Sequence, residues 1–375
     1  MKVVINGAGI AGLTLAQRLS VAGAEVVLLE KAPRPRTSGY LIDFFGPGYD
    51  AAEAMGLLPS ILQRGYRIDE IAYCDESGHR RAGLGIARLA GALGGRLVSL
   101  LRSDLEGALR EHLSNRVDER FARTVTAVEN RADGVTVTLS DGGTVTADLL
   151  VGCDGIHSVT RALAFGPEQE HVRHLGLHTA AFTFDDSAAR VQVGERFWMT
   201  DTLHRTMGFY RLRGGEVAVF AAHRTGDRTL PADPRAALRR EYGALGGNVP
   251  RALAACPPPE HLYYDQVAQS VVPAWSRGRV TLLGDAAYAV SLLAGQGASL
   301  AVAGAYLLAE QLTRQASVDS ALAAYERQLR PLVLTRQRAA RAGLHWFVPT
   351  SRRDQWLRRV ALQLAALPHR GRSAG

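Results

Sequence analysis

The first thirty residues contain a strand, a glycine-rich turn, a helix and a second strand in an order that few folds accommodate. The β-branched run Lys2–Asn6 leads into GAGIAG at residues 7–12, and an amphipathic stretch follows, ending near Gly23. A second apolar run, 26–29, ends in Glu30. This context predicts a parallel βαβ unit that binds a dinucleotide, with Glu30 placed to accept hydrogen bonds from an adenosine ribose.

Each glycine of the turn has a separate task. Gly7 permits the tight turn, Gly9 lets the backbone approach a pyrophosphate, and Gly12 lets the helix pack close to the strand. The N–H groups around Ile10 and Ala11, with the positive end of the helix dipole, face the phosphates. The alternative is a glycine-rich turn in an unrelated α/β protein, and the motif alone does not separate NAD from FAD.

Two further motifs lie far along the chain. The first lies in residues 149–161, where the end of an apolar strand is followed by a turn and the start of a helix. The second follows a strand at 279–283 and leads through a glycine-rich turn into a helical pattern that reaches about residue 312. Their residues are Asp154 and Gly155 in the first motif, and Gly284, Asp285, Gly295, Gln296, Gly297 and Ala298 in the second.

The three motifs together resemble those of the FAD-dependent aromatic hydroxylases, the single-component flavoprotein monooxygenases, over residues 2–325. The segments 39–58 and 275–312 look most like actinobacterial monooxygenases that tailor or inactivate polyketides, including the tetracycline-inactivating type. The resemblance implies FAD as cofactor, NADPH or NADH as reductant, and O2. An aromatic or polyketide-like substrate would be hydroxylated through a C4a-hydroperoxyflavin. A reductase or Baeyer–Villiger oxygenase on the same scaffold, or a flavin-bound protein without turnover, are the alternatives.

The resemblance also implies roles for single residues. Lys31 lies where a basic residue often flanks adenine, and Arg102 matches an arginine that contacts the flavin cofactor. Asp154-Gly155 matches a motif implicated in both FAD and NAD(P)H binding, and Asp285 matches the aspartate that binds the ribityl chain. Such chemistry needs no protein nucleophile, so we assign no catalytic residue.

The glycines that precede the late helix suit a flavin. The N–H groups of Gly295, Gln296 and Gly297, with the helix dipole, can face the flavin pyrimidine ring and stabilise the negative charge of reduced flavin. The sequence departs from the family pattern at two nearby positions. Tyr288 stands where the family usually has histidine, and Leu292 where it usually has a proline beside the reactive flavin edge.

Between the second and third motifs the pattern changes to β, which predicts an inserted sheet with one face as a pocket wall. Large apolar side chains on it suit a flat, apolar substrate, although for each residue taken singly a place in the sheet core is the more favoured interpretation. These substrate candidates are Phe182, Phe184, Met199, Met207 and Phe209.

We therefore predict an α/β fold in which a Rossmann-like FAD-binding domain carries an inserted, mainly β substrate domain and C-terminal helices. The FAD-binding domain comprises residues 1–70, 98–168 and 276–325, the substrate domain 71–97 and 169–275, and the C-terminal helices 326–375. In the last segment, a membrane-surface helix containing Arg352, Arg353, Arg358 and Arg359 is a weaker alternative to domain packing.

Composition excludes several other functions. The net charge of +8 comes from scattered arginines without interleaved aromatic residues, so we expect no nucleic-acid partner. No apolar run reaches the length of about 18 residues that spans a bilayer. Three distant cysteines provide neither a disulfide framework nor a metal site, and we assign no metal. We expect a cytoplasmic monomer or homodimer.

Overall fold

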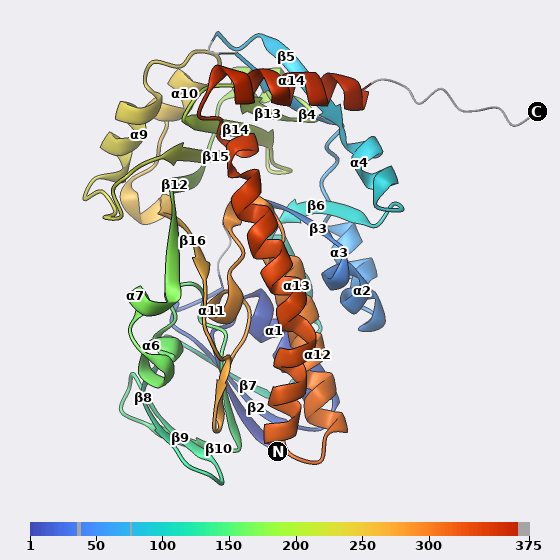
Figure 1. Cartoon of the computed structure of the whole chain (residues 1–375), viewed down its shortest axis with the longest axis vertical. Coiled ribbons are helices and arrows are strands. Elements are labelled where there is room, and N and C mark those ends of the chain that lie inside the picture. Colours follow the sequence, from blue (N-terminus) through green and yellow to red (C-terminus); the bar gives the residue numbers. More distant parts are fainter. Residues whose placement is uncertain (36–38, 76, 367–375) are drawn as a thin grey trace, which may run out of the picture. The chain divides into compact units, whose positions relative to one another are not determined.

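The computed structural model describes residues 1–35, 39–75 and 77–366. The chain forms two compact units (Figure 1). Unit 1 comprises residues 1–66, 96–175 and 267–341, and unit 2 comprises 67–95, 176–266 and 342–375. No helix in the described part of the chain has both the length and the apolar character needed to cross a membrane.

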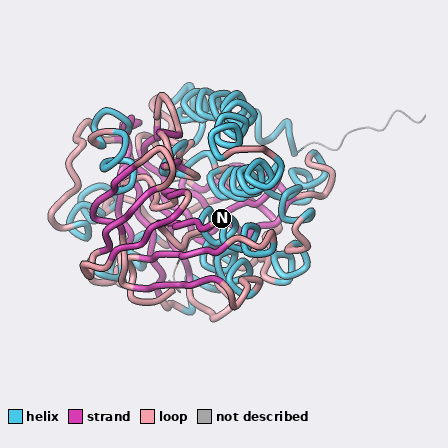
Figure 2. Tube along the Cα trace, turned by 90° about the horizontal axis from the view of Figure 1, so that it is seen from below, coloured by secondary structure: helices cyan, strands magenta, loops and turns pink. Residues whose placement is uncertain are grey.

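A six-stranded sheet, in the order β17-β18-β11-β1-β2-β7, forms the centre of unit 1. Its neighbours β18, β11, β1, β2 and β7 are parallel, and the N-terminus lies beside strands (Figure 2). Val3, Val4 and Ile5 of β1 are all fully buried, as expected of a parallel strand covered on both faces. The strands are β1 (Lys2–Asn6), β2 (Glu25–Glu30), β7 (Val117–Phe121), β11 (Leu149–Gly152), β17 (Ser276–Arg277) and β18 (Val280–Leu282).

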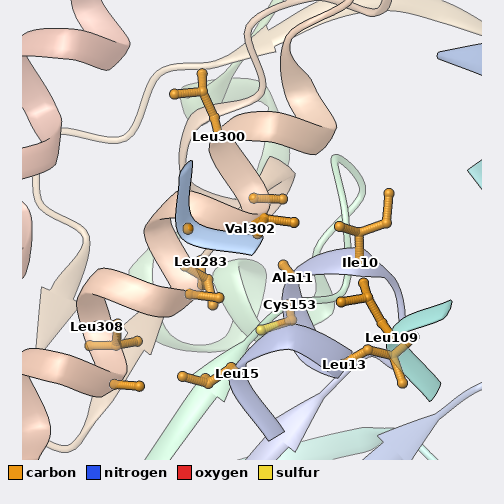
Figure 3. Packing of buried hydrophobic residues seen from close by; sticks show 14 of the residues in the cluster. Ile10, Ala11, Leu13, Leu15, Leu109, Cys153, Leu283, Leu300, Val302 and Leu308 are labelled. Carbon is orange, nitrogen blue, oxygen red and sulfur yellow. The ribbon is translucent and has the colours of Figure 1, made fainter. Parts of the chain in front are cut away.

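The core of unit 1 joins α1 (Ile10–Val21) to α12 (Gly297–Arg314). Leu13 and Leu15 of α1 pack in the same cluster as Leu300 and Leu308 of α12, and Figure 3 shows them with Cys153, which follows β11. These contacts bring the glycine-rich turn before α1 and the glycine-rich turn before α12 into one unit.

Smaller elements complete unit 1. Strands β3 and β6 form an antiparallel pair, and β8, β9 and β10 form a three-stranded antiparallel sheet. The strands are β3 (Leu41–Phe45), β6 (Leu97–Leu101), β8 (Val125–Asn130), β9 (Val135–Leu139) and β10 (Thr144–Ala147). The helices are α2 (Pro47–Ala54), α3 (Leu58–Gln63), α5 (Arg102–Glu111), α6 (Val159–Phe165), α7 (Glu168–His171), α11 (Asp285–Tyr288), the 3-10 turn Leu292–Ala294, and α13 (Val318–Phe347), whose last turns belong to unit 2.

Unit 2 is built on a seven-stranded sheet in the order β16-β12-β15-β14-β13-β4-β5. The start of β12 and the end of β16 belong to unit 1. The strands are β4 (Glu70–Cys74), β5 (Arg80–Gly85), β12 (Val172–Phe184), β13 (Arg196–Thr200), β14 (Arg205–Arg211), β15 (Val217–Arg224) and β16 (Tyr263–Ser270). The helices are α4 (Ile86–Ala92), α8 (Ser187–Val193), α9 (Pro234–Tyr242), α10 (Val249–Ala254), the 3-10 turn Pro259–His261, and α14 (Arg352–Ala366).

The structure confirms the predicted α/β class, with a Rossmann-like domain and a mainly β unit inserted in it. It divides the predicted C-terminal segment 326–375 between the two units, and the last nine residues of that segment lie outside the described part. The reason is local: Leu329 and Val333 of α13 enter the core of unit 1, whereas Arg358 and Leu362 of α14 are buried in unit 2.

Candidate functional site

The glycine-rich turn between β1 and α1 can be built only from glycine at two positions. Gly7 has a φ of +111°, and a β-carbon there would lie 2.5 Å from the carbonyl oxygen of Cys153. At Gly12 a β-carbon would overlap the carbonyl oxygen of Gly7. Ile10 and Ala11 belong to the core cluster of unit 1, so their side chains are engaged in packing and leave the backbone of this turn as the group that can bind a ligand. The turn therefore presents N–H groups at a helix start, which suits a phosphate.

Glu30, at the end of β2, connects the turn to the next strand. One carboxylate oxygen accepts the N–H of Ala8 at 3.0 Å, and the other accepts the N–H of Ala32 at 2.9 Å. A carboxylate has about four lone-pair positions, so both oxygens can accept further hydrogen bonds from the hydroxyls of a ribose. The neighbouring Lys31 is exposed.

Arg102, at the start of α5, brings positive charge to the turn. A β-carbon on Gly9 would lie 3.4 Å from Arg102 Nη2, and the same nitrogen is 2.9 Å from Glu106 Oε1. Arg102 also acts on Asp285: burial raises the pKa of the Asp285 carboxyl, and the charge of Arg102 opposes that rise. The Asp285 side chain nevertheless reaches solvent, so it is an accessible acceptor enclosed by protein on several sides.

The N-terminus of α12 lies next to Asp285. A β-carbon on Gly297 would be 3.7 Å from Asp285 Oδ1, while Gly284 packs so closely that its β-carbon would lie 2.9 Å from Cβ of Ala11. Gly295 has a φ of +64°, a left-handed conformation that favours glycine. The partly exposed residues Gln296, Gly297 and Ala298 begin an 18-residue helix with a strong dipole. Two helix N-termini, a cation and an acceptor thus meet within unit 1.

Comparison with known proteins identifies the family of this chain. The sequence profile of the FAD binding domain family matches residues 1–338. The chain belongs to this family. An uncharacterised protein of Mycobacterium tuberculosis is 34% identical over 83% of this chain and 84% of its own length. A flavin-dependent monooxygenase from an unknown prokaryotic organism is 28% identical over 90% of this chain and 87% of that protein. The crystal structure of the tetracycline destructase Tet(55) has a TM-score of 0.83 at 25% identity, covering 97% of this chain and 95% of the other.

As a member of the FAD binding domain family, the chain is an FAD-dependent monooxygenase, an oxidoreductase. The residues present suit FAD, because the site combines unhindered backbone N–H groups for a pyrophosphate, acceptors for ribose and ribityl hydroxyls, and a helix N-terminus for a ring that becomes anionic. The assignment of each predicted FAD-binding residue to a particular FAD atom stays a prediction.

The Asp154 carboxylate of the central motif accepts hydrogen bonds from neighbouring residues of unit 1. Asp154 Oδ2 accepts from the Thr160 N–H at 2.9 Å and from the Asn6 side-chain amide at 3.2 Å. Its Oδ1 accepts the Ser158 hydroxyl at 2.5 Å. Asp154 therefore fastens the end of β1 to the start of α6. Gly155 has a φ of +84°, and apart from its two chain neighbours no described residue has an atom within 4 Å of the position that a β-carbon would take, so this side of the turn is open.

Arg161 is a residue whose importance the sequence did not indicate. Its side chain is fully buried in unit 1, where it donates to the carbonyl of Ala286 at 2.9 Å and to that of Ile156 at 2.6 Å. Burial lowers the pKa of the Arg161 guanidinium, and the charges of Glu168 and Asp154 oppose that shift. Arg161 thereby connects the central motif to α11, which starts with Asp285. Its place in the first turn of the helix that follows the Asp-Gly motif was the one local signal.

The five predicted substrate-binding residues lie in two different environments in the structure. Phe182, Phe184 and Met207 are at most 5% exposed and lie on the sheet face covered by α8, α9 and α10. The structure places these three side chains in the core of unit 2, and their contact with a substrate stays a prediction. Phe209 shares this core but also lines a small pocket, as does Met199, which packs with Phe197 on the opposite face. Met199 and Phe209 stay predictions.

Proposed function

We propose that this monooxygenase uses NADPH or NADH and O2 to hydroxylate an aromatic or polyketide-like substrate with bound FAD. The observation that carries the proposal is the convergence in unit 1 of the glycine-rich turn, Glu30, Arg102, Asp285 and the N-terminus of α12. The likeness to a tetracycline destructase supports a polycyclic polyketide as the substrate class.

In this proposal each residue has a binding or electrostatic role. The N–H groups of the glycine-rich turn hold the pyrophosphate, and Glu30 accepts hydrogen bonds from the adenosine ribose. Arg102 adds a positive charge beside the turn, and Asp285 accepts from the ribityl chain. The N-terminus of α12 stabilises negative charge on the ring without having to reorganise. Asp154-Gly155 contributes through the backbone of its open turn, because the Asp154 carboxylate is engaged by Asn6, Ser158 and Thr160.

Bound FAD supplies the electron transfer and the oxygen chemistry. The chain contributes position: it orients the ring, excludes water and orients the substrate. Met199 and Phe209 are the substrate contacts that we retain, because both border a pocket in unit 2 together with Trp198.

The test begins with the purified protein. A flavin absorption spectrum and FAD in a denatured extract are expected, and a protein that takes up no FAD would contradict the proposal. NADPH and NADH oxidation is then measured with and without tetracyclines, other polycyclic polyketides and simple phenols. Oxidation that accelerates with substrate, and a product with one oxygen atom from labelled O2, support hydroxylation. Insertion of that atom between two carbons would indicate a Baeyer–Villiger oxygenase, and oxidation unresponsive to every substrate would indicate a binding protein.

A further inference from the structure

The backbone between α11 and α12 takes an unusual path. Ser291 has φ 147° and ψ 137°, a conformation that residues with a β-carbon rarely adopt. Its hydroxyl oxygen accepts the Leu293 N–H at 3.2 Å, and its carbonyl accepts the Ala294 N–H at 3.1 Å. Such a conformation persists only where the surroundings hold it in place. Neighbouring residues must therefore hold the backbone at Ser291 in place.

Two buried glutamines donate hydrogen bonds to the backbone immediately before Ser291. The side-chain amide of Gln269, in β16, donates to the carbonyl of Val290 at 2.6 Å. The amide of Gln337, in α13, donates to the carbonyl of Ala289 at 3.0 Å. Gln269 and Gln337 are 0% and 3% exposed, so neither amide is available to solvent. Consecutive carbonyls are thus fixed from two different elements.

The two glutamines also hold each other. Gln337 donates to the backbone carbonyl of Ser270 at 2.8 Å, and Gln269 donates to the backbone carbonyl of Gln337 at 3.0 Å. Arg341 donates to Gln269 Oε1 at 2.7 Å, which fixes the orientation of that amide. All these bonds of the glutamine clamp, formed by Gln269 and Gln337, lie within unit 1.

The clamp extends to the cofactor side of the segment. The hydroxyl of Ser270 donates to the carbonyl of Asp285 at 2.5 Å, and the N–H of Ser270 donates to the carbonyl of Ala289 at 3.2 Å. The end of β16 therefore lies along the whole stretch 285–290. That stretch begins with the proposed ribityl acceptor and leads, through Ser291, to the start of α12.

We propose that Gln337, acting with Gln269, is a positioning residue that sets the N-terminus of α12 against the flavin by holding Ser291 in its strained conformation. The inference rests on the proposed FAD site. Loss of the clamp lets residues 289–294 relax, so that the N–H groups at Gly297 no longer align with the anionic ring. Reduced flavin then loses more stabilisation than oxidised flavin does.

The experiment uses Gln337→Met, which keeps the length of the side chain and removes its donor. Gln311→Met is the matched control, because Gln311 is a buried glutamine of α12 in the same unit whose side chain accepts from Gln315, away from the segment 289–294. The FAD reduction potential, the flavin visible spectrum and the melting temperature of the FAD-free protein are measured. We expect Gln337→Met to reduce the preference for reduced over oxidised flavin about tenfold, a fall of about 30 mV for two electrons. The control leaves the potential unchanged.

Ser291→Gly provides an independent arm, because glycine adopts this φ without strain and has no need of the clamp to do so. In a Ser291→Gly background, Gln337→Met is expected to change the potential much less than it does in the wild type. Potentials equal in wild type and Gln337→Met, or fully additive shifts in the double variant, would overturn the positioning role. A wild-type protein that binds no FAD would instead refute the proposed function, and that result is seen before any variant is compared.

Discussion

The hydroxyl of Tyr288 occupies the space that a β-carbon on Gly304 would need. Tyr288 ends α11 and Gly304 lies in α12, so this contact sets the spacing of the two helices beside the FAD site. The hydroxyl also accepts from Tyr325 at 3.4 Å, and the ring centroid is 4.7 Å from that of Trp275. The tyrosine at the family's usual histidine position is therefore a packing residue, 2% exposed.

Gly304→Ala is expected to destabilise the protein by about 1–3 kcal/mol through overpacking. In an unhindered helix the same change would stabilise by about 1 kcal/mol, so the sign of the result tests the contact. Tyr288→Phe removes the obstructing hydroxyl, and the double variant should recover part of the loss. Urea unfolding of the single and double variants measures this coupling; independent, additive effects would contradict it.

Asp285→Asn should stabilise the FAD-free protein and weaken FAD binding. Burial raises the pKa of Asp285 above its ordinary value of 3.8, although Arg102 opposes the shift. The folded state then binds more protons than the unfolded state just above pH 3.8, so ionisation of Asp285 costs stability as the pH rises through its folded-state pKa. Melting temperatures at neutral pH and fluorescence titration with FAD check both effects. Asp148→Asn, at an exposed carboxylate, is the control for charge alone.

A buried group of histidine and tyrosine side chains in unit 2 predicts that the folded protein loses stability in acid. His223 Nδ1 is 3.3 Å from the Tyr242 hydroxyl, and its Nε2 is 3.3 Å from the Tyr264 hydroxyl, which also contacts His178. Burial lowers the pKa of His223 from 6.5 to about 4, with Glu241 opposing. The unfolded state therefore binds more protons between these values, and stability falls as the pH drops from 6.5 toward 4.

The full contribution of His223 is about 3 kcal/mol, since one pKa unit corresponds to about 1.4 kcal/mol. Urea unfolding of the wild type and of His223→Gln is compared from pH 7 to pH 4. The glutamine variant is expected to lose distinctly less stability over this range than the wild type. Parallel curves would show that the histidine is not the titrating group.

Asp201 fastens α14 to the sheet of unit 2. Its carboxylate pairs with Arg358 and Arg359, and both Asp201 and Arg358 have fully buried side chains. Arg358 also donates to the carbonyl of Trp346 at 2.8 Å. These two arginines are thus engaged by protein, which weakens the membrane-surface interpretation of this helix.

Asp201→Asn should cost about 3–5 kcal/mol, because it leaves buried guanidinium charge without its partner. Hydrogen exchange should show α14 opening before the rest of unit 2. Asp354→Asn, on the same helix, should have a much smaller effect, because the Asp354 carboxylate accepts from the Thr350 hydroxyl and not from a buried arginine. Equal protection of α14 in the wild type and in Asp201→Asn would contradict the fastening role.

The sequence predicted the fold around the three motifs well, because the signals for it are local. The spacing of Gly7, Gly9 and Gly12 between two apolar runs specifies a turn that only glycine can form, and β1 has the predicted bounds. Asp285 and Gly297 likewise adjoin a strand and a helix that are evident from the pattern of residues.

The sequence could not predict the face of the inserted sheet or the glutamine clamp. Ala218 and Phe220 on one side of β15, and Val217 and Val219 on the other, are all buried, so alternation gives no clue to which face the helices cover. Gln269 and Gln337 are brought together only by the fold, and a single glutamine whose partners are distant in sequence is indistinguishable from a surface residue.

The order of strands in unit 1 also has a consequence for how this protein is made. Val4 of β1 pairs with Leu150 of β11, and Leu150 in turn pairs with Val280 of β18. A nascent chain therefore cannot complete the sheet until the segment containing Val280 has left the ribosome. Until then β11 is an unpaired edge strand, and its pairing with other chains competes with folding. We therefore expect chaperones that shield this half-built sheet to raise the yield of folded enzyme.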